Sequence, residues 1–308
     1  MNKINNYLKL KIVLLLLLIL IILMIVILLF IKKKLNKKTN INLENFIDKN
    51  NYILPKTIWV YWDNPILPHN ISLIINNNKK ILGNEWIINV LNDSNINDYL
   101  DIETFPKNYY NLKIQAKTDF VRLKLLHKYG GIWMDASIII NSKDELNNIF
   151  TKTIDDTIEL TAFTLYEKDN SYKYHQYIES WFLIAPKNSN IISLWLEEFE
   201  QAINIGFHEY KKYIKEKLNV KLFSKIENSD CYLTIHTALQ VVLQNKINYL
   251  PKLLLLNSEN DMFKLYSDCN WDNECIKHEF ETNKDIKKIP YIKLTSSGSG
   301  LDMDKYFS

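Results

Sequence analysis

The chain has 308 residues, of which 47% are hydrophobic and 24% are charged, with only 6 Gly and 7 Pro. A chain this apolar can bury a sizeable core, which excludes collagen, coiled-coil rods and extended disorder. The formal net charge is only +3, from 38 basic and 35 acidic residues. This balance provides no global field for holding a polyanion, so we expect no nucleic-acid partner.

The first element is an uninterrupted apolar run, residues 12–31, without a charge or Pro. As a helix it would span about 30 Å, the hydrocarbon thickness of a bilayer. A cleaved signal peptide has a shorter apolar region and a small-residue cleavage site, whereas this run ends in Lys32-Lys33-Lys34. We therefore predict four segments: an N-terminal tail (1–11), one transmembrane helix (12–31), a Lys- and Asn-rich stalk (32–52) and a single catalytic body (53–308).

Two questions stay open at this point. Lysines flank both ends of the apolar run, and their count leans toward a cytoplasmic body, whereas glycosylation acceptor triplets begin at Asn70 and Asn92. The side of the membrane is therefore undetermined. The three cysteines allow either one bridge, Cys269 to Cys275 with Cys231 left over, or three unpaired thiols.

The body begins with an alternation of strand, helix and strand. Residues 54–62 are β-branched and aromatic with Pro55 at the entrance, which predicts a strand. A helix is predicted at 72–82 and a second strand at 85–91. This alternation favours an α/β sheet with parallel strands.

The central stretch has apolar residues at helical spacing over 112–129, and Gly130-Gly131 ends that helix. A short buried strand, Ile132-Trp133-Met134, leads to Asp135, and an aliphatic run follows at 138–140. Further along, the sequence predicts strands at 161–166 and 180–185, helices at 190–205 and 231–244, and a last strand at 289–294 that runs into a flexible loop at 295–300.

Two features of the central stretch can carry chemistry. Asp119 and Arg122 are three residues apart and therefore share a helix face, where the Arg fork suits phosphate oxygens. An ordinary surface ion pair is the alternative. Asp135 lies at the carboxyl end of an internal strand, where open α/β sheets bind ligands. With Ser137 it could offer hard oxygen ligands to Mg²⁺ or Mn²⁺, and a turn-capping Asp is the alternative.

Taken together, residues 116–122 and 129–137 resemble the core motif of sugar-nucleotide-dependent glycosyltransferases. The resemblance is to the group that contains capsular polysaccharide synthesis proteins, yeast-type initiating mannosyltransferases and, more distantly, large clostridial glucosylating toxins. Residues 55–62 resemble the opening strand of that group and residues 178–185 its acceptor-side segment. The resemblance covers roughly 54–199, with a weaker echo at 293–295. It implies an A-type glycosyltransferase fold, a Rossmann-like sheet that carries an Asp-x-Asp metal motif.

The resemblance also implies roles for individual residues. Trp62 matches the position that stacks on the nucleotide base, and Asp119 and Arg122 match the pair that contacts the donor sugar and diphosphate. Asp135 matches one carboxylate of the metal motif, and Ser137 stands where the second carboxylate is expected. Capsular-type members often have Asp-Ala-Ser or Asp-Ala-Thr here, so the departure points to that branch.

Weaker candidates complete the predicted site. Trp181 could stack on a sugar ring or pack in the core. His236 could be a third metal ligand or an acceptor contact, with an ordinary helix histidine as the alternative. Lys293 and Ser296 would close over the diphosphate if the tail folds back as a lid. We nominate no catalytic nucleophile.

The expected activity is transfer of a hexose from a UDP- or GDP-hexose to a glycan or glycolipid acceptor, with Mn²⁺ or Mg²⁺ as cofactor and with retention of anomeric configuration. Two alternatives are a non-catalytic, membrane-tethered sugar- or nucleotide-binding protein and a metal-dependent phosphosugar transferase. The first is suggested by Ser137. The glycosyltransferase interpretation requires Asp119, Arg122 and Asp135 to converge on one cleft at the rim of the sheet.

Overall fold

The structure is a computed structural model that describes residues 52–165 and 177–308. These residues belong to one compact unit, Lys49–Ser308. The predicted tail, the predicted transmembrane helix and all but the last residue of the predicted stalk lie outside the described residues. Within the described ranges, no helix has the length and apolar character needed to cross a bilayer.

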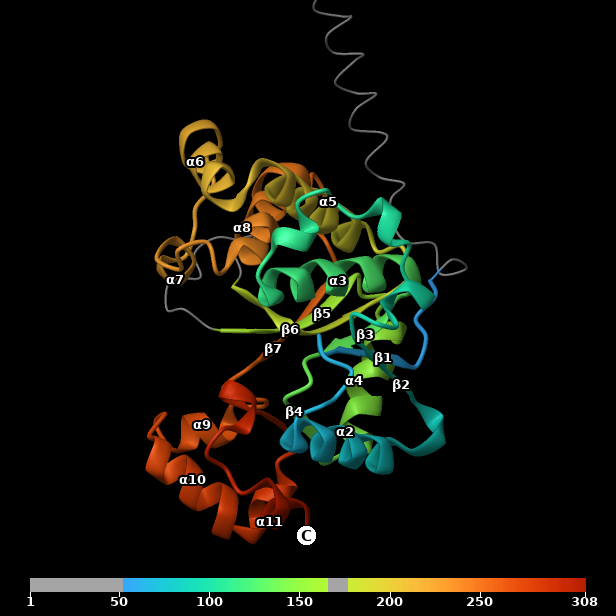
Figure 1. Ribbon diagram of the computed structural model, residues 1–308, viewed down its shortest axis with the longest axis vertical. Helices are drawn as coiled ribbons and strands as arrows, with labels where there is room; N and C mark the ends of the chain where they lie inside the picture. The colour runs from blue at the N-terminus through green and yellow to red at the C-terminus, as the bar shows by residue number, and fades with distance from the viewer. Residues whose placement is uncertain (1–51, 166–176) are drawn as a thin grey trace, which may run out of the picture. The chain divides into compact units, whose positions relative to one another are not determined.

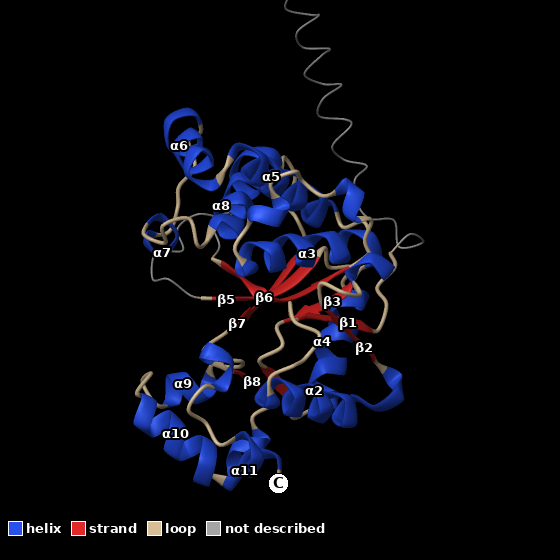
Figure 2. Ribbon diagram, viewed as in Figure 1, coloured by secondary structure: helices blue, strands red, loops and turns tan. Residues whose placement is uncertain are grey.

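A six-stranded sheet forms the centre of the unit, with strand order β2-β1-β3-β6-β5-β7, and β4 and β8 form a separate antiparallel pair (Figures 1 and 2). Strand β1 runs parallel to β2 and β3, β7 runs parallel to β5, and β6 runs antiparallel to its neighbours β3 and β5. The strands are β1 (Thr57–Tyr61), β2 (Ile87–Leu91), β3 (Gly131–Met134), β4 (Ile138–Ile140), β5 (Leu160–Thr164), β6 (Ile178–Ala185), β7 (Leu253–Asn257) and β8 (Tyr291–Lys293). The mixed α/β class is confirmed, and the one departure from a parallel sheet is β6.

Helices cover both faces of this sheet. Helices α3, α5 and α8 lie on one face, and α2 and α4 lie on the other (Figure 1). The α-helices are α2 (His69–Leu82), α3 (Ile114–Tyr129), α4 (Lys143–Asp155), α5 (Asn190–Ile205), α6 (Phe207–Lys217), α7 (Ser224–Glu227), α8 (Thr234–Val241), α9 (Lys264–Asp268), α10 (Asn273–Thr282) and α11 (Met303–Phe307).

The alternation of side chains along β1 shows how the sequence divides the core. Ile58 and Val60 join the hydrophobic cluster that includes α2 and α4, whereas Trp59 and Tyr61 join the cluster under α3 and α5. Successive strand residues point to opposite faces, so a strand covered on both sides is apolar throughout. This is why the sequence run at 57–61 reads as a buried strand.

Most predicted elements are present within a few residues of their expected bounds, and α5 has the predicted bounds. Strand β7 and helices α4, α6, α7, α9, α10 and α11 were not predicted. In the segment predicted as a flexible loop after the last strand, the structure has a 3₁₀ turn, η8 (Thr295–Gly298), and α11 follows it. A Cβ at Gly298 would lie 2.9 Å from Leu294 Cδ1, so this turn is tightly packed.

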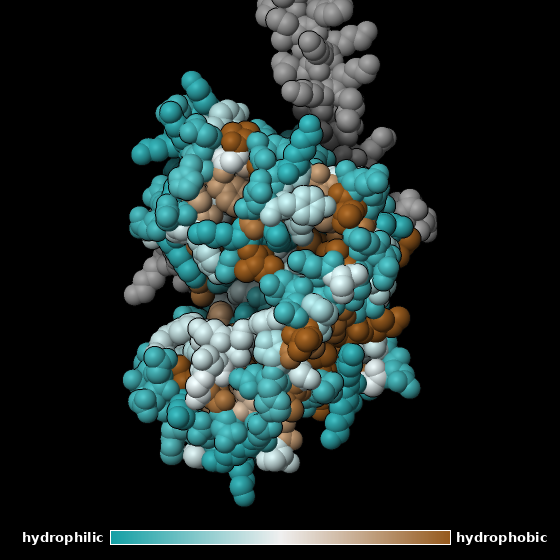
Figure 3. Space-filling view, in the orientation of Figure 1, coloured by the Kyte–Doolittle hydropathy of each residue, from teal (hydrophilic) through white to brown (hydrophobic). Residues whose placement is uncertain are grey.

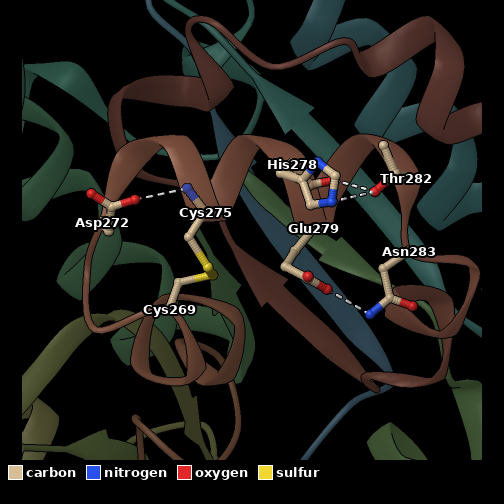
Figure 4. Close-up of a disulfide and its surroundings, with 7 residues drawn as sticks. All are labelled: Cys269, Asp272, Cys275, His278, Glu279, Thr282 and Asn283. Atoms are coloured by element: carbon tan, nitrogen blue, oxygen red, sulfur yellow. Dashed lines mark hydrogen bonds between the residues drawn. A yellow bond between two sulfur atoms is a disulfide. The ribbon is translucent and has the colours of Figure 1, made fainter.

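Cys269 and Cys275 form a disulfide, which selects the bridged alternative (Figure 4). The bridge joins the end of α9 to α10, and the Asp272 side chain between them accepts a hydrogen bond from Cys275 N at 2.8 Å. Cys231 is free. On the face shown in Figure 3 the surface is largely hydrophilic, with hydrophobic residues gathered over the region of β1 and β2 at the sheet edge.

Candidate functional site

A cavity of about 780 Å³ lies where the ends of β1 and β3 meet α3, β6, α8 and the turn after β8. All of the residues singled out from the sequence line it: Trp62, Asp119, Arg122, Asp135, Ser137, Trp181, His236, Lys293 and Ser296. Residues from both ends of the described chain therefore contribute to one concave site. The three side chains at 119, 122 and 135 meet at this cavity.

The Gly130-Gly131 turn places Asp135 beside helix α3. Both glycines have positive φ, 71° and 101°. A Cβ on Gly130 would lie 2.4 Å from Lys187 N, and one on Gly131 would lie 2.5 Å from Thr57 O. Only glycine fits such close backbone approaches at positive φ. The chain can therefore pass from α3 directly into β3, next to β1, and return along the helix that carries Asp119 and Arg122.

Arg122 joins the two carboxylates of the site. Its Nη1 donates a hydrogen bond to Asp119, and its Nη2 donates to Asp135 Oδ1 at 3.2 Å. The guanidinium carbon lies 4.9 Å from the centre of the Trp133 ring, and Trp133 Nε1 donates to the same Asp135 oxygen at 3.1 Å. With only 4% of its surface exposed, Arg122 is fixed by these partners. The planar guanidinium fork suits this double contact, which a lysine ammonium could not make in the same geometry.

The composition contains a signal for Arg122 that the motif reasoning did not use. Arg122 is the only arginine among the 38 Lys and Arg residues of the chain. This one guanidinium contacts both carboxylates of the site, Asp119 and Asp135.

Lys293 contacts Asp135 from the other side. Its Nζ donates a hydrogen bond to Ser137 Oγ at 2.7 Å and lies 3.5 Å from Asp135 Oδ2. Each oxygen of Asp135 therefore faces a cation, Arg122 on Oδ1 and Lys293 on Oδ2. Burial raises the pKa of the Asp119 carboxyl, and the positive charge of Arg122 opposes that rise.

Glu179 on β6 is a site residue that the sequence reasoning missed. It is 7% exposed, lines the cavity and lies 3.9 Å from His236 Nε2 through its Oε2. The Tyr177 ring stacks on the His236 ring at 5.3 Å between centroids. The available signal was a single acidic residue inside the mostly hydrophobic and fully buried strand 178–185. A buried carboxylate beside a buried imidazole is a polar pair at the wall of the cavity.

The two predicted tryptophans differ in their surroundings. Trp62 is partly buried at the rim of the cavity, just beyond the end of β1. Trp181 is 8% exposed and stacks on Phe163 at 5.1 Å, so it packs in the core and lines the cavity at the same time. Within the described parts of the chain, its indole Nε1 has no hydrogen-bond partner. A ligand in the cavity could supply one.

The residues around Asp135 do not fit a divalent ion as they are arranged. Mg²⁺ is usually bound through one or two carboxylates at about 2.0–2.1 Å, and Asp135 Oδ2 already has the Lys293 ammonium beside it. Ser137 adds only a neutral hydroxyl, and its oxygen already accepts a hydrogen bond from the same ammonium. Among the residues that the structure describes, the one cluster of three His, Cys, Asp or Glu ligands is His208, Asp230 and Cys231, which lies outside the cavity.

Comparison with known proteins gives the family. The capsular polysaccharide synthesis protein family matches residues 26–204, more than half of the chain. The chain belongs to this family. Trp62, Asp119, Arg122, Asp135 and Ser137 lie within the matched segment, as do Glu179 and Trp181, whereas His236 and Lys293 lie beyond it.

Two curated relatives of this family member carry glycosyltransferase names. The O-glycosyltransferase braB of Annulohypoxylon truncatum is 28% identical over 176 residues, covering 50% of this chain and 40% of the relative. The probable glycosyltransferase FCK3 of Fusarium pseudograminearum is 27% identical over 168 residues, covering 50% of this chain and 41% of the relative. The matched segment thus spans about two fifths of each relative's length. A solved glycosyltransferase structure, GlyE of Streptococcus pneumoniae, aligns over 80% of this chain and 55% of its own at 13% identity, with a TM-score of 0.38.

Proposed function

We propose that this family member is a glycosyltransferase that moves a hexose from a UDP- or GDP-hexose to a glycan or glycolipid acceptor, on an A-type glycosyltransferase fold. Its curated relatives carry glycosyltransferase names. The cavity of about 780 Å³ falls within the range of about 300–1,000 Å³ that is usual for small-molecule sites. This volume suits a ligand that joins a base, a diphosphate and a sugar.

The observation that carries the proposal is the pair of cations on Asp135. Arg122 and Lys293 hold different oxygens of this carboxylate, and both line the cavity. Cleavage of the bond between the sugar and the nucleoside diphosphate makes a leaving group with high negative charge. Fixed cations in a partly buried site stabilise that charge as it develops, without reorganising at the moment of reaction.

The rest of the cavity supplies groups for a base and for sugar hydroxyls. Trp62 at the rim offers an aromatic face for the base, which supports the role implied by the family resemblance. Asp119 and Glu179 are carboxylates that can accept hydrogen bonds from hydroxyls of the donor or the acceptor. Placement of the acceptor hydroxyl against the anomeric carbon is then largely a matter of orientation.

One alternative has an observation in its favour. A non-catalytic sugar- or nucleotide-binding protein would use the same cavity, and the neutral Ser137 in place of a second carboxylate is what this alternative would expect. The phosphosugar transferase interpretation has no such support. Retention of configuration, the use of Mn²⁺ or Mg²⁺ and attachment to a membrane by residues 12–31 all stay predictions of the sequence.

Turnover of nucleotide sugars tests the proposal. The full chain, purified in detergent, is incubated with a panel of UDP- and GDP-hexoses and a glycan mixture, with and without Mn²⁺, and the released nucleoside diphosphate is measured. The proposal predicts that at least one donor releases its nucleoside diphosphate and that Asp119→Asn abolishes this release. The control Asp285→Asn, which changes an exposed aspartate between α10 and β8, should keep it. Binding without release in every condition would support the non-catalytic alternative. Mass spectrometry of the product shows whether a phosphate was transferred with the sugar.

A further inference from the structure

We propose that the ammonium of Lys293 provides the positive charge at Asp135 and Ser137 that a divalent ion provides at a two-carboxylate motif, so that the nucleoside diphosphate binds without metal. This inference rests on the proposed function, because it concerns how the donor of that reaction is held. It assigns a donor-binding role to a residue that lies beyond the family-matched segment, residues 26–204.

The contacts of Lys293 are those of a cation in a built site. Its Nζ lies 2.7 Å from Ser137 Oγ, 3.3 Å from Leu294 O and 3.5 Å from Asp135 Oδ2. Its side chain is 13% exposed, so these oxygens replace most of the water around the ammonium. The group still lines the cavity, where the phosphate oxygens of a donor would complete its coordination.

The backbone holds Lys293 in this position from both sides. In the β4–β8 pair, Lys293 lies opposite Ile138, and Leu294 N donates a hydrogen bond to Ser137 O at 2.9 Å. Lys293 N also donates to Met262 O at 2.9 Å. The residue therefore belongs to an ordered strand rather than to a free tail, and its side chain is directed to the segment that follows β3.

The balance of charge supports the exchange of a metal for an ammonium. Two carboxylates with one divalent ion carry no net charge. In this chain Ser137 is neutral, so the site has one carboxylate, Asp135, and one ammonium, Lys293. Their charges also sum to zero. The donor's diphosphate would meet the same net charge in both arrangements. An ion that bound to Asp135 Oδ2 would also lie close to the ammonium, and the two cations would repel each other.

Nucleotide binding by the full chain tests this inference. UDP and GDP are titrated by calorimetry into the wild-type protein, in buffer with EDTA and in buffer with Mn²⁺. The same titrations are made with Lys293→Met, which keeps an unbranched side chain one atom shorter and removes the charge. Lys288→Met is the matched control, since Lys288 is exposed and lies outside the cavity.

The inference predicts that the wild type and Lys288→Met bind one of the two nucleotides in EDTA with an affinity within about threefold of that in Mn²⁺. Lys293→Met should bind at least about tenfold more weakly in EDTA, the loss expected for one charge-assisted hydrogen bond, and Mn²⁺ should restore part of that loss. Wild-type binding that collapses in EDTA would overturn the inference and leave the proposed function standing. If neither UDP nor GDP binds the wild type, with EDTA or with Mn²⁺, both the inference and the proposed function are overturned. The wild-type comparison needs no variant, so it can overturn the inference even if Lys293→Met does not fold.

Discussion

Lys293 donates a hydrogen bond to Ser137 across 2.7 Å, although the two residues are 156 positions apart in the sequence. The contact forms because β8 pairs with β4, which follows Ser137 directly. The last strand of the chain is therefore part of the site and not only part of the core. The proposed donor site and the packing of the C-terminal segment therefore share this pair.

Replacement of Arg122 by lysine should impair the site although the charge is kept. One ammonium cannot donate to Asp119 and Asp135 in the geometry of the guanidinium, so a buried carboxylate loses its partner. We expect Arg122→Lys to lower the free energy of unfolding by about 1–3 kcal/mol and donor affinity by at least about tenfold. Urea denaturation and nucleotide titration measure the two effects. A variant with wild-type values in both would show that charge alone is sufficient at this position.

The glycine turn between α3 and β3 allows a matched comparison. Gly130 and Gly83 both follow a helix with positive φ, 71° and 61°, but a Cβ on Gly130 would meet Lys187 N at 2.4 Å, whereas nothing lies within 4 Å of one on Gly83. Alanine is disfavoured to a similar degree at both positions because of the positive φ. Only Gly130→Ala adds a clash with another part of the backbone. We expect Gly130→Ala to be less stable than Gly83→Ala by about 1–3 kcal/mol in urea denaturation. Equal losses would contradict the close approach.

A metal site should appear when Ser137 is replaced by a carboxylate and the ammonium of Lys293 is removed at the same time. The double variant Ser137→Asp with Lys293→Met has two carboxylates two residues apart and no ammonium between them. We expect it to bind Mn²⁺ at least about tenfold more tightly than the wild type, because carboxylate oxygens are preferred ligands of such ions. Titration of Mn²⁺ followed by electron paramagnetic resonance measures this. If the double variant binds Mn²⁺ no better than the wild type, Lys293 is not what keeps the ion out.

The stability of the fold should fall in mild acid because of His127 on α3. Burial lowers the pKa of this imidazole, and the nearby Lys124 lowers it further. As the pH falls below the ordinary value of about 6.5, the unfolded chain binds the proton before the folded chain does, so the free energy of unfolding decreases. This term is absent in His127→Gln and cannot exceed about 1.4 kcal/mol per pH unit. Urea denaturation between about pH 7 and about pH 5 should show a shallower decline for the variant. Parallel declines would remove His127 as a cause.

Much of the fold could be predicted because local patterns were strong. The strand at 57–61 is apolar on both faces, and the helix that ends at Tyr129 has helical spacing and a Gly-Gly stop. Strand β7 was missed because Leu253–Asn257 follows a Pro-containing segment that gave no clear start, and a short leucine run fits helix and strand equally. The antiparallel direction of β6 depends on its long-range pairing with β3, which no local pattern records.

The candidate site was predictable where its residues are neighbours in the sequence. Asp119, Arg122 and Asp135 share one helix–turn–strand unit, so helical spacing, the Gly-Gly turn and the family resemblance together predicted that they meet. The pairing of Lys293 with Asp135 and the proximity of Glu179 to His236 depend on strand and helix packing between distant segments. For these contacts, the sequence offered only indirect signs, such as a lone acidic residue in a buried strand.

The most direct test of the central claim is the thermal stability of the full chain in a panel of nucleotide sugars. A ligand that binds only the folded state stabilises it by about 2.7 kcal/mol at 100 times its dissociation constant. We predict that at least one UDP- or GDP-hexose raises the melting temperature of the wild type by several degrees and raises that of Arg122→Lys far less at the same concentration. No shift with any nucleotide sugar, with or without Mn²⁺, would contradict the assignment of this cavity to a nucleotide-sugar donor.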